Sequence, residues 1–337
     1  MLFVGIDLHK KTIAVCVVDQ QRTVIGRRTL RCIEPDSIVD YFRSLGAFQA
    51  VVEATASYEW LWQLLEPLAD RLALAHPKKL RVIAESRRKS DRIDAQVLAE
   101  FLARDEVPES YRPTPRQRQH RALVRQRCYL RRRASAAKVK IRRILMDYNA
   151  DRRGLFSVEG LKYLAEVKLS PADRFVVDQL LDEWRHRMKQ LKGMEARLKE
   201  FAREAPAAEQ EARAALSSIP GVGPVTVDVV LSEVADVRRF KSVKDVVAYA
   251  GLAPGFRESA GKRQALGISK EGSRLLRWAL VEAAWRLVRL TRRWETVFES
   301  LSQRRGKRKA IVSVARRLLT MMAAVWRDGA RYRPAHV

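Results

Sequence analysis

Residues 2–31 read LFVGIDLHKKTIAVCVVDQQRTVIGRRTLR, and this stretch decides the fold. Apolar and β-branched residues fill positions 2–7 and 12–19, and residues 23–31 partly alternate between apolar and polar types. Charged turns separate the three runs. Short runs of this composition, bounded by polar turns, are typical of β-strands. The stretch therefore predicts three successive strands at the start of the chain.

The chain then alternates between helical and strand patterns up to residue 104. The hydrophobic spacing predicts helices at 36–45, 57–72 and 91–104 and strands at 50–54 and 80–84. The resulting order, βββαβαβα on a mixed sheet, is the ribonuclease H-like (RuvC-like) layout, although many α/β folds alternate in a similar way. We therefore predict an α/β amino-terminal domain of this type, followed by a mostly helical remainder.

Composition points to a nucleic acid as the partner. The 337 residues include 66 Lys and Arg against 39 Asp and Glu, which gives a formal net charge of +27. A chain this basic suits a polyanion. The 47% hydrophobic content is too high for a disordered basic tail and suffices for about two folded domains.

Several classes of protein are excluded by the same sequence. Cys16, Cys32 and Cys128 are too widely spaced for a disulfide framework or a zinc site. No apolar run reaches the roughly 18 residues that a membrane span needs. Asp7 interrupts the apolar start of the chain, which argues against a signal peptide. We expect no membrane association and a reduced, cytoplasmic location close to the bacterial nucleoid.

The middle region, residues 111–210, begins with a strongly basic segment. Residues 112–143 include 13 Arg or Lys, no Asp or Glu, and no Gly or Pro after Pro115. This predicts a long basic helix, whose charges repel one another unless counter-charges are present. A solvated face is the simpler alternative, but we favour phosphate contacts by Arg125, Arg131, Arg132, Arg133 and Lys138.

An apolar heptad pattern follows at 173–204. Its core positions hold Val177, Leu181, Trp184, Met188, Leu191, Leu198 and Ala202, and Glu195 interrupts one of them. The pattern predicts a coiled-coil hairpin or a helix pair between two chains. Residues 205–210 are expected to form a linker to a mostly helical third part with helices at 274–290 and 309–326. The predicted domains are 1–110, 111–210 and 211–337.

Four acidic residues of the first domain are candidate metal ligands. Asp7 ends the first strand and Glu53 lies near the end of the fourth, and these two strands are neighbours in a ribonuclease H-like sheet. Asp91 and Asp94 are three residues apart at a helix start and share one face. Four carboxylates would repel one another without cations between them, and Mg²⁺ prefers such ligands. Two Mg²⁺ ions about 4 Å apart could stabilise both oxygens exchanged at a phosphodiester.

Each acid by itself also has an ordinary interpretation. Asp91 could cap its helix, Asp7 could be a turn residue at a strand end, and Glu53 could be a salt-bridge partner. Only the pattern of all four on matching elements favours the metal site.

The second half contains several glycine-rich stretches. Residues 216–226, Leu-Ser-Ser-Ile-Pro-Gly-Val-Gly-Pro-Val-Thr, fit a helix-hairpin-helix turn in which Gly221 and Gly223 allow a tight bend before a helix start that can bind phosphate. A purely structural turn is the alternative. Residues 251–263 and 267–277 are rich in Gly and basic residues, and we expect loops that grip phosphates through Lys262, Arg263 and Lys270. A helix is expected to begin at Ser273.

Ser259 lies in the first of these expected loops. A serine can attack a DNA phosphorus if its proton is removed and cations hold the phosphate. By its chemistry alone, however, Ser259 is an ordinary loop serine.

The motifs of both halves together resemble one transposase family. Gly-Ile-Asp at 5–7, Val-Val-Glu-Ala-Thr at 51–55 and Lys-Ser-Asp-Arg-Ile-Asp-Ala at 89–95 are similar to the DEDD motifs of the IS110 family, with its IS1111 branch and the related Piv-type DNA invertases. The glycine turn at 219–226, Ala-Tyr-Ala-Gly-Leu-Ala-Pro at 248–254, Ser-Ala-Gly-Lys at 259–262 and Ile-Ser-Lys-Glu-Gly at 268–272 match in the same order. Ser90 and Ala260 depart from the common Thr and Gly.

The resemblance implies a specific activity. It implies a RuvC-like domain, a coiled-coil linker and a transposase domain whose serine attacks DNA while the acidic cluster binds Mg²⁺. Ser259 matches the family's serine, and Ser269 is the nearby alternative. The two parts form a composite site between subunits, which implies a homodimer or tetramer. The implied partners are the DNA of the element ends and target and a structured non-coding guide RNA, the bridge RNA.

Three functional hypotheses follow from the sequence. The first is an insertion-sequence transposase, a site-specific recombinase that uses Ser259, Mg²⁺ and the four acids. The second is a RuvC-type junction nuclease that needs the acids and an activated water but no serine. The third is a non-catalytic protein that binds RNA or DNA through its basic helix and glycine hairpin.

Overall fold

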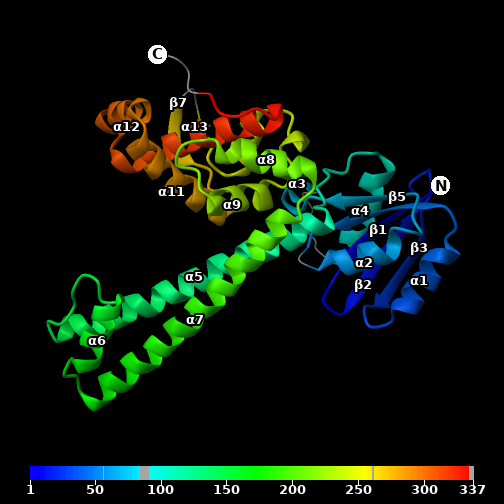
Figure 1. Cartoon of the computed structure of the whole chain (residues 1–337). Coiled ribbons are helices and arrows are strands. Elements are labelled where there is room, and N and C mark those ends of the chain that lie inside the picture. The colour runs from blue at the N-terminus through cyan, green and yellow to red at the C-terminus, as the bar shows by residue number, and fades with distance from the viewer. Residues whose placement is uncertain (56, 84–90, 260–261, 334–337) are drawn as a thin grey trace. The chain divides into compact units, whose positions relative to one another are not determined.

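The chain forms two compact units, Met1–Arg112 and Pro113–Val337. A computed structural model (Figure 1) describes residues 1–55, 57–83, 91–259 and 262–333. The division falls close to the predicted boundary after residue 110. The further separation of 111–210 from 211–337 stays a prediction.

The first unit is built on a five-stranded sheet of order β3-β2-β1-β4-β5. β1 pairs antiparallel with β2 and parallel with β4, and β4 pairs parallel with β5. The predicted neighbourhood of the first and fourth strands is therefore confirmed. The strands are β1 Leu2–Leu8, β2 Thr12–Val18, β3 Val24–Arg31, β4 Phe48–Glu53 and β5 Arg71–Ala75.

Helices cover both faces of this sheet. On one face, Val4 and Ile6 of β1 pack into one core with Phe42 of α1 (Pro35–Ser44) and Leu61 of α2 (Tyr58–Leu65). On the other face lies α4 (Asp91–Ala103), which contacts β1, β2 and β4. Because side chains alternate along a strand, each strand contributes to both cores.

The contact between α4 and the sheet is closest at Gly5. A Cβ atom on Gly5 would lie 1.9 Å from the carbonyl oxygen of Ala95 and 2.5 Å from the amide nitrogen of Ala99. Only a residue without a side chain fits between β1 and α4 at this distance. Gly5 therefore sets how deeply α4 lies on the sheet.

One predicted strand is wrong. Residues 80–83 belong to helix α3 (Pro77–Ile83), and the fifth strand is β5 at Arg71–Ala75, whose first two residues lie in the predicted helix 57–72. Pro67 explains the error, because proline cannot donate the hydrogen bond that would continue α2 beyond Leu65. Ala84 lies outside the described residues.

The second unit begins with a long helical hairpin. α5 (Pro115–Asp147) and α7 (Pro171–Arg203) lie side by side, joined through α6 (Val158–Glu166), as Figure 1 shows. Thr114 caps α5, accepting a hydrogen bond from the amide of Gln117 while Gln117 bonds back to the Thr114 amide. The predicted basic helix and the hairpin alternative of the coiled coil are thus confirmed.

The predicted heptad positions form most of the hairpin's seam. Val177, Leu181, Leu191 and Leu198 are buried, while Trp184, Met188 and Ala202 are half-buried. Phe201 is buried beside the predicted Ala202. The interruption at Glu195 is explained by Arg127 of α5, whose Nη2 lies 2.6 Å from Glu195 Oε1.

The remainder of the second unit is mostly helical. Two predictions need correction here: α8 begins at Ala207, within the expected linker 205–210, and the expected loop at 251–263 contains strand β6, which pairs antiparallel with β7. The two segments are strands because their backbones pair with each other, an interaction that neither segment shows by itself. The elements are α8 Ala207–Ser217, α9 Pro224–Val234, the 3₁₀ helix η1 Val237–Arg239, α10 Val243–Tyr249, β6 Pro254–Ser259, β7 Lys262–Ile268, α11 Arg274–Leu290, α12 Arg292–Arg305 and α13 Lys307–Asp328.

The predicted helix from Ser273 is confirmed, since Ser273 caps α11 by accepting a hydrogen bond from the amide of Leu276. Within the described part of the chain, no helix combines the length and the apolar character that crossing a membrane requires.

We expect Gly5→Ala to destabilise the first unit. Its added methyl group would overlap the backbone of Ala95, and overpacking of this kind costs about 1–3 kcal/mol or more. The measurement is the midpoint of urea unfolding, followed by circular dichroism. Gly26→Ala is the matched control, because the nearest atom to a Cβ there is 3.9 Å away. Equal midpoints for the two variants would contradict the close contact.

Candidate catalytic and nucleic-acid sites

Asp7 and Glu53 lie at the same edge of the sheet. The β1–β4 register pairs Ile6 with Val52, so Asp7 and Glu53 are the next residues along two parallel, adjacent strands. Alternation puts them on the same face as Gly5 and Val51, which is the face that α4 covers. Two of the four predicted ligands are thereby brought together.

Asp7 is well shielded from solvent. It is only 7% exposed, and its Oδ2 lies 3.1 Å from Nε2 of His9, the second residue after it. A carboxylate in such a place is costly unless cationic or hydrogen-bonding groups surround it. Asp7 therefore has the chemistry of a metal ligand or of an ion-pair partner, and His9 is an additional polar group that the sequence did not single out.

Asp91 and Asp94 lie in the first turn of α4. Ala95, the residue after Asp94, is the one whose carbonyl approaches Gly5, so this turn lies over the sheet face that carries Asp7. Asp94 is exposed, and the side chain of Asp91 lies outside the described residues, as do Lys89 and Ser90 of the same motif. Over the residues that the structure describes, no three His, Cys, Asp or Glu side chains form a metal-binding group.

Ser259 and Ser269 lie at opposite ends of the β6–β7 hairpin. Ser259 ends β6 and pairs with Lys262, and Ser269 directly follows Ile268 at the end of β7. The seven residues of β7 lie between the end that pairs with Ser259 and the end that precedes Ser269, which separates the two serines by roughly 20 Å along the hairpin. The two serines cannot replace each other at one site. Ala260 lies outside the described residues, and of Lys262 and Arg263 the structure describes only the backbone within β7.

Three of the five predicted phosphate-binding side chains on α5 have partners within the protein. Arg125 binds the buried Glu233 of α9 through two hydrogen bonds, 2.9 Å from Nε and 3.1 Å from Nη2, and these raise the pKa of Arg125. Arg133 pairs with Glu183 of α7 at 2.8 Å. Lys138 lies over the rings of Phe156 and Trp184, where burial and then the nearby Arg131 and Arg142 lower its pKa.

Arg131 and Arg132 are different. Both are exposed, and among the described residues neither has a carboxylate partner. They are therefore the members of the predicted set whose charge is available to an external anion.

The glycine turn packs tightly on α11. Gly221 has a φ of +79°, and a Cβ on it would lie 2.7 Å from the amide nitrogen of Leu287. Gly223 caps α9, followed by Pro224 at its first position, and a Cβ on Gly223 would lie 3.5 Å from Nη1 of Arg286. Gly221 thus serves close packing, whereas Gly223 lies at a helix start beside an arginine. Lys270 is exposed and has a φ of +57°.

A pocket brings the basic helix and the glycine turn together. It has a volume of about 450 Å³, and its lining includes Arg131 of α5, Gly223 at the start of α9, Trp278 and Arg286 of α11, and the two carboxylates of Glu195 and Glu282. We call it the α9–α11 pocket. Trp278 is 48% exposed, which is unusual for tryptophan. Sequence reasoning missed Trp278 and Arg286, because an apolar and basic helix gives no sign of which residues stay outside its core.

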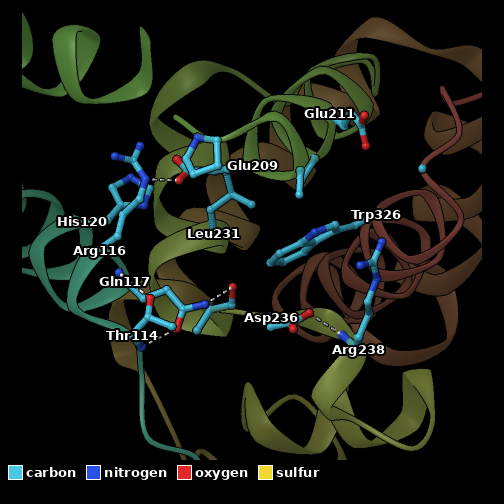
Figure 2. A pocket seen from close by; sticks show the side chains of 15 residues that line it. Thr114, Arg116, Gln117, His120, Glu209, Glu211, Leu231, Asp236, Arg238 and Trp326 are labelled. Atoms are coloured by element: carbon cyan, nitrogen blue, oxygen red, sulfur yellow. Dashed lines mark hydrogen bonds and ion pairs between the residues drawn. The ribbon is translucent and has the colours of Figure 1, made fainter. Parts of the chain in front are cut away.

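Figure 2 shows a second pocket, of about 270 Å³, at the start of α5. Arg116 Nε lies 2.7 Å from Glu209 Oε2, and the Nε2 of Gln117 donates to the carbonyl of Ala235. These bonds fasten the start of α5 to α8 and α9. The pocket has a structural explanation and is assigned no ligand.

Two transposase family models match the chain. A DEDD transposase model of the IS110 type matches residues 4–150, and the model described as "Transposase IS116/IS110/IS902 family" matches residues 213–299. The first segment holds the acidic edge and the second holds the glycine turn and Ser259.

Full-length relatives agree with the family models. The transposase for insertion sequence element IS1111A of Coxiella burnetii is 28% identical, over 92% of this chain and 85% of its own length. A probable family 20 transposase of Pseudomonas aeruginosa is 25% identical over 98% of both chains. The pilin gene-inverting protein of Moraxella lacunata is 24% identical over 97% of this chain and 96% of its own.

The sheet order, its acidic edge and these similarities define a DEDD transposase with a RuvC-like domain, an enzyme that cleaves and transfers DNA strands. The chain belongs to the IS110/IS116/IS902 transposase family, which also makes it a homologue of the pilin gene-inverting proteins. Of the three functional hypotheses, these findings favour the insertion-sequence transposase.

The Arg125–Glu233 pair predicts a difference in stability between two arginines of α5. Arg125→Gln leaves Glu233, which is 2% exposed, without its partner, and an unsatisfied buried group of this kind costs about 1–3 kcal/mol. Arg132→Gln removes the same charge from an exposed position, where changes stay within about 0.5 kcal/mol. Urea unfolding of both variants measures the difference. If both unfold at the same denaturant concentration, the pair does not anchor α5.

Proposed function

We propose that this transposase excises and inserts an insertion sequence by cutting and rejoining DNA through a covalent phosphoserine intermediate. The observation that carries it is the position of Asp7 and Glu53, side by side at the ends of adjacent strands under α4. Ser259, at the end of β6, lies in the second segment that matches the family. The proposed reaction uses residues of both units.

The acidic edge is the proposed Mg²⁺ site. The four side chains offer only carboxylate oxygens, which fits Mg²⁺; they are Asp7, Glu53, Asp91 and Asp94. Asp7 is nearly buried, and a cation beside it would stabilise its negative charge. DEDD transposase domains suggest such divalent metal binding. When bound, Mg²⁺ would polarise the scissile phosphate and stabilise charge on the leaving oxygen, and four carboxylates could hold two ions.

The serine step exchanges one phosphodiester for another. The Oγ of Ser259 forms a bond to phosphorus, and the bond from phosphorus to one deoxyribose oxygen breaks. The serine loses its proton and the leaving oxygen gains one, so no net proton is consumed. Reversal by a deoxyribose hydroxyl of another strand rejoins the DNA. Because the phosphoserine bond conserves the energy of the phosphodiester, no nucleotide cofactor is needed.

The α9–α11 pocket is the proposed contact for DNA of the element ends and target. Arg131 and Arg286 offer guanidinium groups to a phosphate, and Gly223 places the start of α9 beside them, as a helix-hairpin-helix does. Such contacts position the backbone without reading its sequence. The exposed ring of Trp278 offers a surface on which a base can stack.

A structured non-coding guide RNA is the proposed source of sequence specificity. Internal ion pairs leave the net charge of +27 unbalanced, and the exposed Arg132 beside Arg131 extends the basic surface along α5. Phosphate contacts alone do not select a target sequence. Base pairing by a bound RNA would supply this selection.

A homodimer or tetramer is the proposed assembly. Large exposed apolar side chains gather along the α5–α7 hairpin, a pattern that marks an interaction surface. They are Tyr129, Val139, Met146, Tyr148, Val158, Phe175 and Val176. Association through the hairpin would bring two copies of each catalytic part into one complex.

The covalent intermediate is tested by trapping protein on nicked DNA. Ser259→Ala should lower the yield of the denaturant-resistant protein–DNA adduct at least about a thousandfold, because it removes the nucleophile. Asp7→Asn or chelation of divalent cations should do the same while DNA binding persists. The adduct is measured by denaturing gel electrophoresis with labelled DNA.

Ser269→Ala is the matched control and should form the adduct normally, since Ser269 lies at the other end of the hairpin. If Ser259→Ala still cuts DNA at the normal rate while Asp7→Asn is inactive, water replaces serine as the nucleophile. The enzyme would then be a junction nuclease.

The α9–α11 pocket is tested by the double variant Arg131→Gln/Arg286→Gln. Loss of two charge-assisted phosphate contacts should weaken DNA binding at least about tenfold. Lys140→Gln/Arg289→Gln changes the same charge on the same two helices, at exposed positions outside the pocket, and should have a smaller effect. Fluorescence anisotropy with DNA and with RNA measures both. If both double variants lose DNA affinity equally, the loss reflects net charge and the pocket is not a DNA contact.

A further inference from the structure

A groove lies between the last two helices of the chain, α12 and α13. The two helices pack against each other and are joined at Gly306, whose φ of +76° allows the turn (Figure 1). The groove has a volume of about 610 Å³ and shares no lining residue with the α9–α11 pocket. It is lined by Arg292, Arg293, Thr296, Val297, Ser300, Leu301, Arg304 and Arg317.

The groove is positively charged without compensation. Four of its eight lining residues are arginine and none is acidic. From residue 292 to residue 317 the chain has nine Lys or Arg and two Glu, Glu295 and Glu299. Over the described residues, no ion pair joins either glutamate to an arginine of the groove. An excess of positive charge along one groove attracts anions, so the groove is suited to an anionic ligand.

The remaining lining residues suit a sugar–phosphate chain. Ser300 supplies a hydroxyl group between the arginines, whereas the Thr296 hydroxyl donates to the carbonyl of Arg292 at 3.1 Å, and Val297 and Leu301 supply an apolar floor. Arg304 donates from Nε to the carbonyl of Ser300 and from Nη2 to its Oγ, at 3.2 and 3.0 Å. These bonds orient the Arg304 guanidinium but leave its charge uncompensated. Hydroxyls and arginines are common donors to DNA phosphates.

The arginines are spaced along the groove rather than gathered at one point. Arg293, Val297, Ser300 and Arg304 recur every three or four residues, on one face of α12. From Arg293 to Arg304 the helix rises roughly 17 Å. Phosphates of one DNA strand advance about 3.4 Å along the duplex axis per nucleotide and wind around it, so a straight row of this length faces about two or three of them. A single small anion would not use such an extended row.

We propose that the α12–α13 groove is a second DNA-backbone site, separate from the α9–α11 pocket, which holds one strand of the duplex. The occupant is DNA because strand cleavage and transfer of DNA is the activity that the family establishes. The site rests on that activity alone and is independent of the serine mechanism.

The site is tested in the full-length protein with the variant Arg292→Gln/Arg293→Gln/Arg304→Gln/Arg317→Gln. Binding of a DNA duplex is measured by fluorescence anisotropy over a series of KCl concentrations. Each lost phosphate contact lowers the slope of log Kobs against log salt by about 0.9, so we expect a slope smaller by about 2 to 3.

Two further variants keep the result interpretable. Lys189→Gln/Lys192→Gln/Lys199→Gln/Arg203→Gln removes four exposed cations of α7 and should change the slope by less than about 1. The same four groove arginines changed to lysine keep the charge and should keep most of the slope. If the groove and α7 variants lose slope equally, only net charge matters and the site does not exist.

The ligand and the mechanism are separated by two more measurements. If the groove variant loses affinity for a matching RNA duplex but keeps its affinity for DNA, the DNA assignment is wrong. At saturating protein, the groove variant should still form the phosphoserine adduct, whereas Ser259→Ala should not. Adduct formation tests the serine mechanism, and the salt dependence of DNA binding tests the groove. Either proposal can therefore be contradicted without affecting the other.

Discussion

The close contact between α4 and β1 is the constraint on which the first unit depends. Gly5 leaves no side chain between them, so the backbone of Ala95 and Ala99 lies directly on the strand. This depth fixes the first turn of α4, which holds Asp94, over the sheet edge that carries Asp7 and Glu53. Gly5 is two residues before Asp7. A methyl group at Gly5 would push α4 away from the sheet and so move Asp94 away from Asp7.

A different constraint orders the second unit, where buried acids locate the basic helix. Glu233 binds Arg125, and Asp228 binds His120 and Arg213, so α5 is fixed to α9 by charge as well as by packing. Burial of Asp228 favours its neutral form, but hydrogen bonds from His120 and Arg213 outweigh this, and its pKa lies below its ordinary value. The basic helix therefore divides into residues that hold the fold and residues that stay available for phosphates.

Elements that depend on neighbouring residues could be predicted from the sequence, whereas elements that depend on contacts between distant segments could not. The alternation in residues 2–31 is local, and it located β1, β2 and β3 to within one residue or so. The strand expected at 80–84 was wrong because Pro67 ended α2 early and freed 71–75 to pair with β4. Expected loops at 251–263 formed a hairpin, since pairing between β6 and β7 is not visible in either segment alone. The roles of the four acids and of Ser259 stay predictions.

The sequence by itself determined the fold class of the first unit, the parallel neighbours β1 and β4, the basic helix and the seam of the hairpin. The elements depend on periodicity, which is written into consecutive residues, whereas the pairing of β1 with β4 was inferred from the ribonuclease H-like layout that their order indicates. The tertiary structure alone decided which cations are free. Arg125 and Arg131 are indistinguishable in a run of arginines, yet Arg125 meets the buried Glu233 and Arg131 lines the α9–α11 pocket. The reason is physical: the availability of a charge depends on groups far away in the sequence, and only folding brings them within bonding distance.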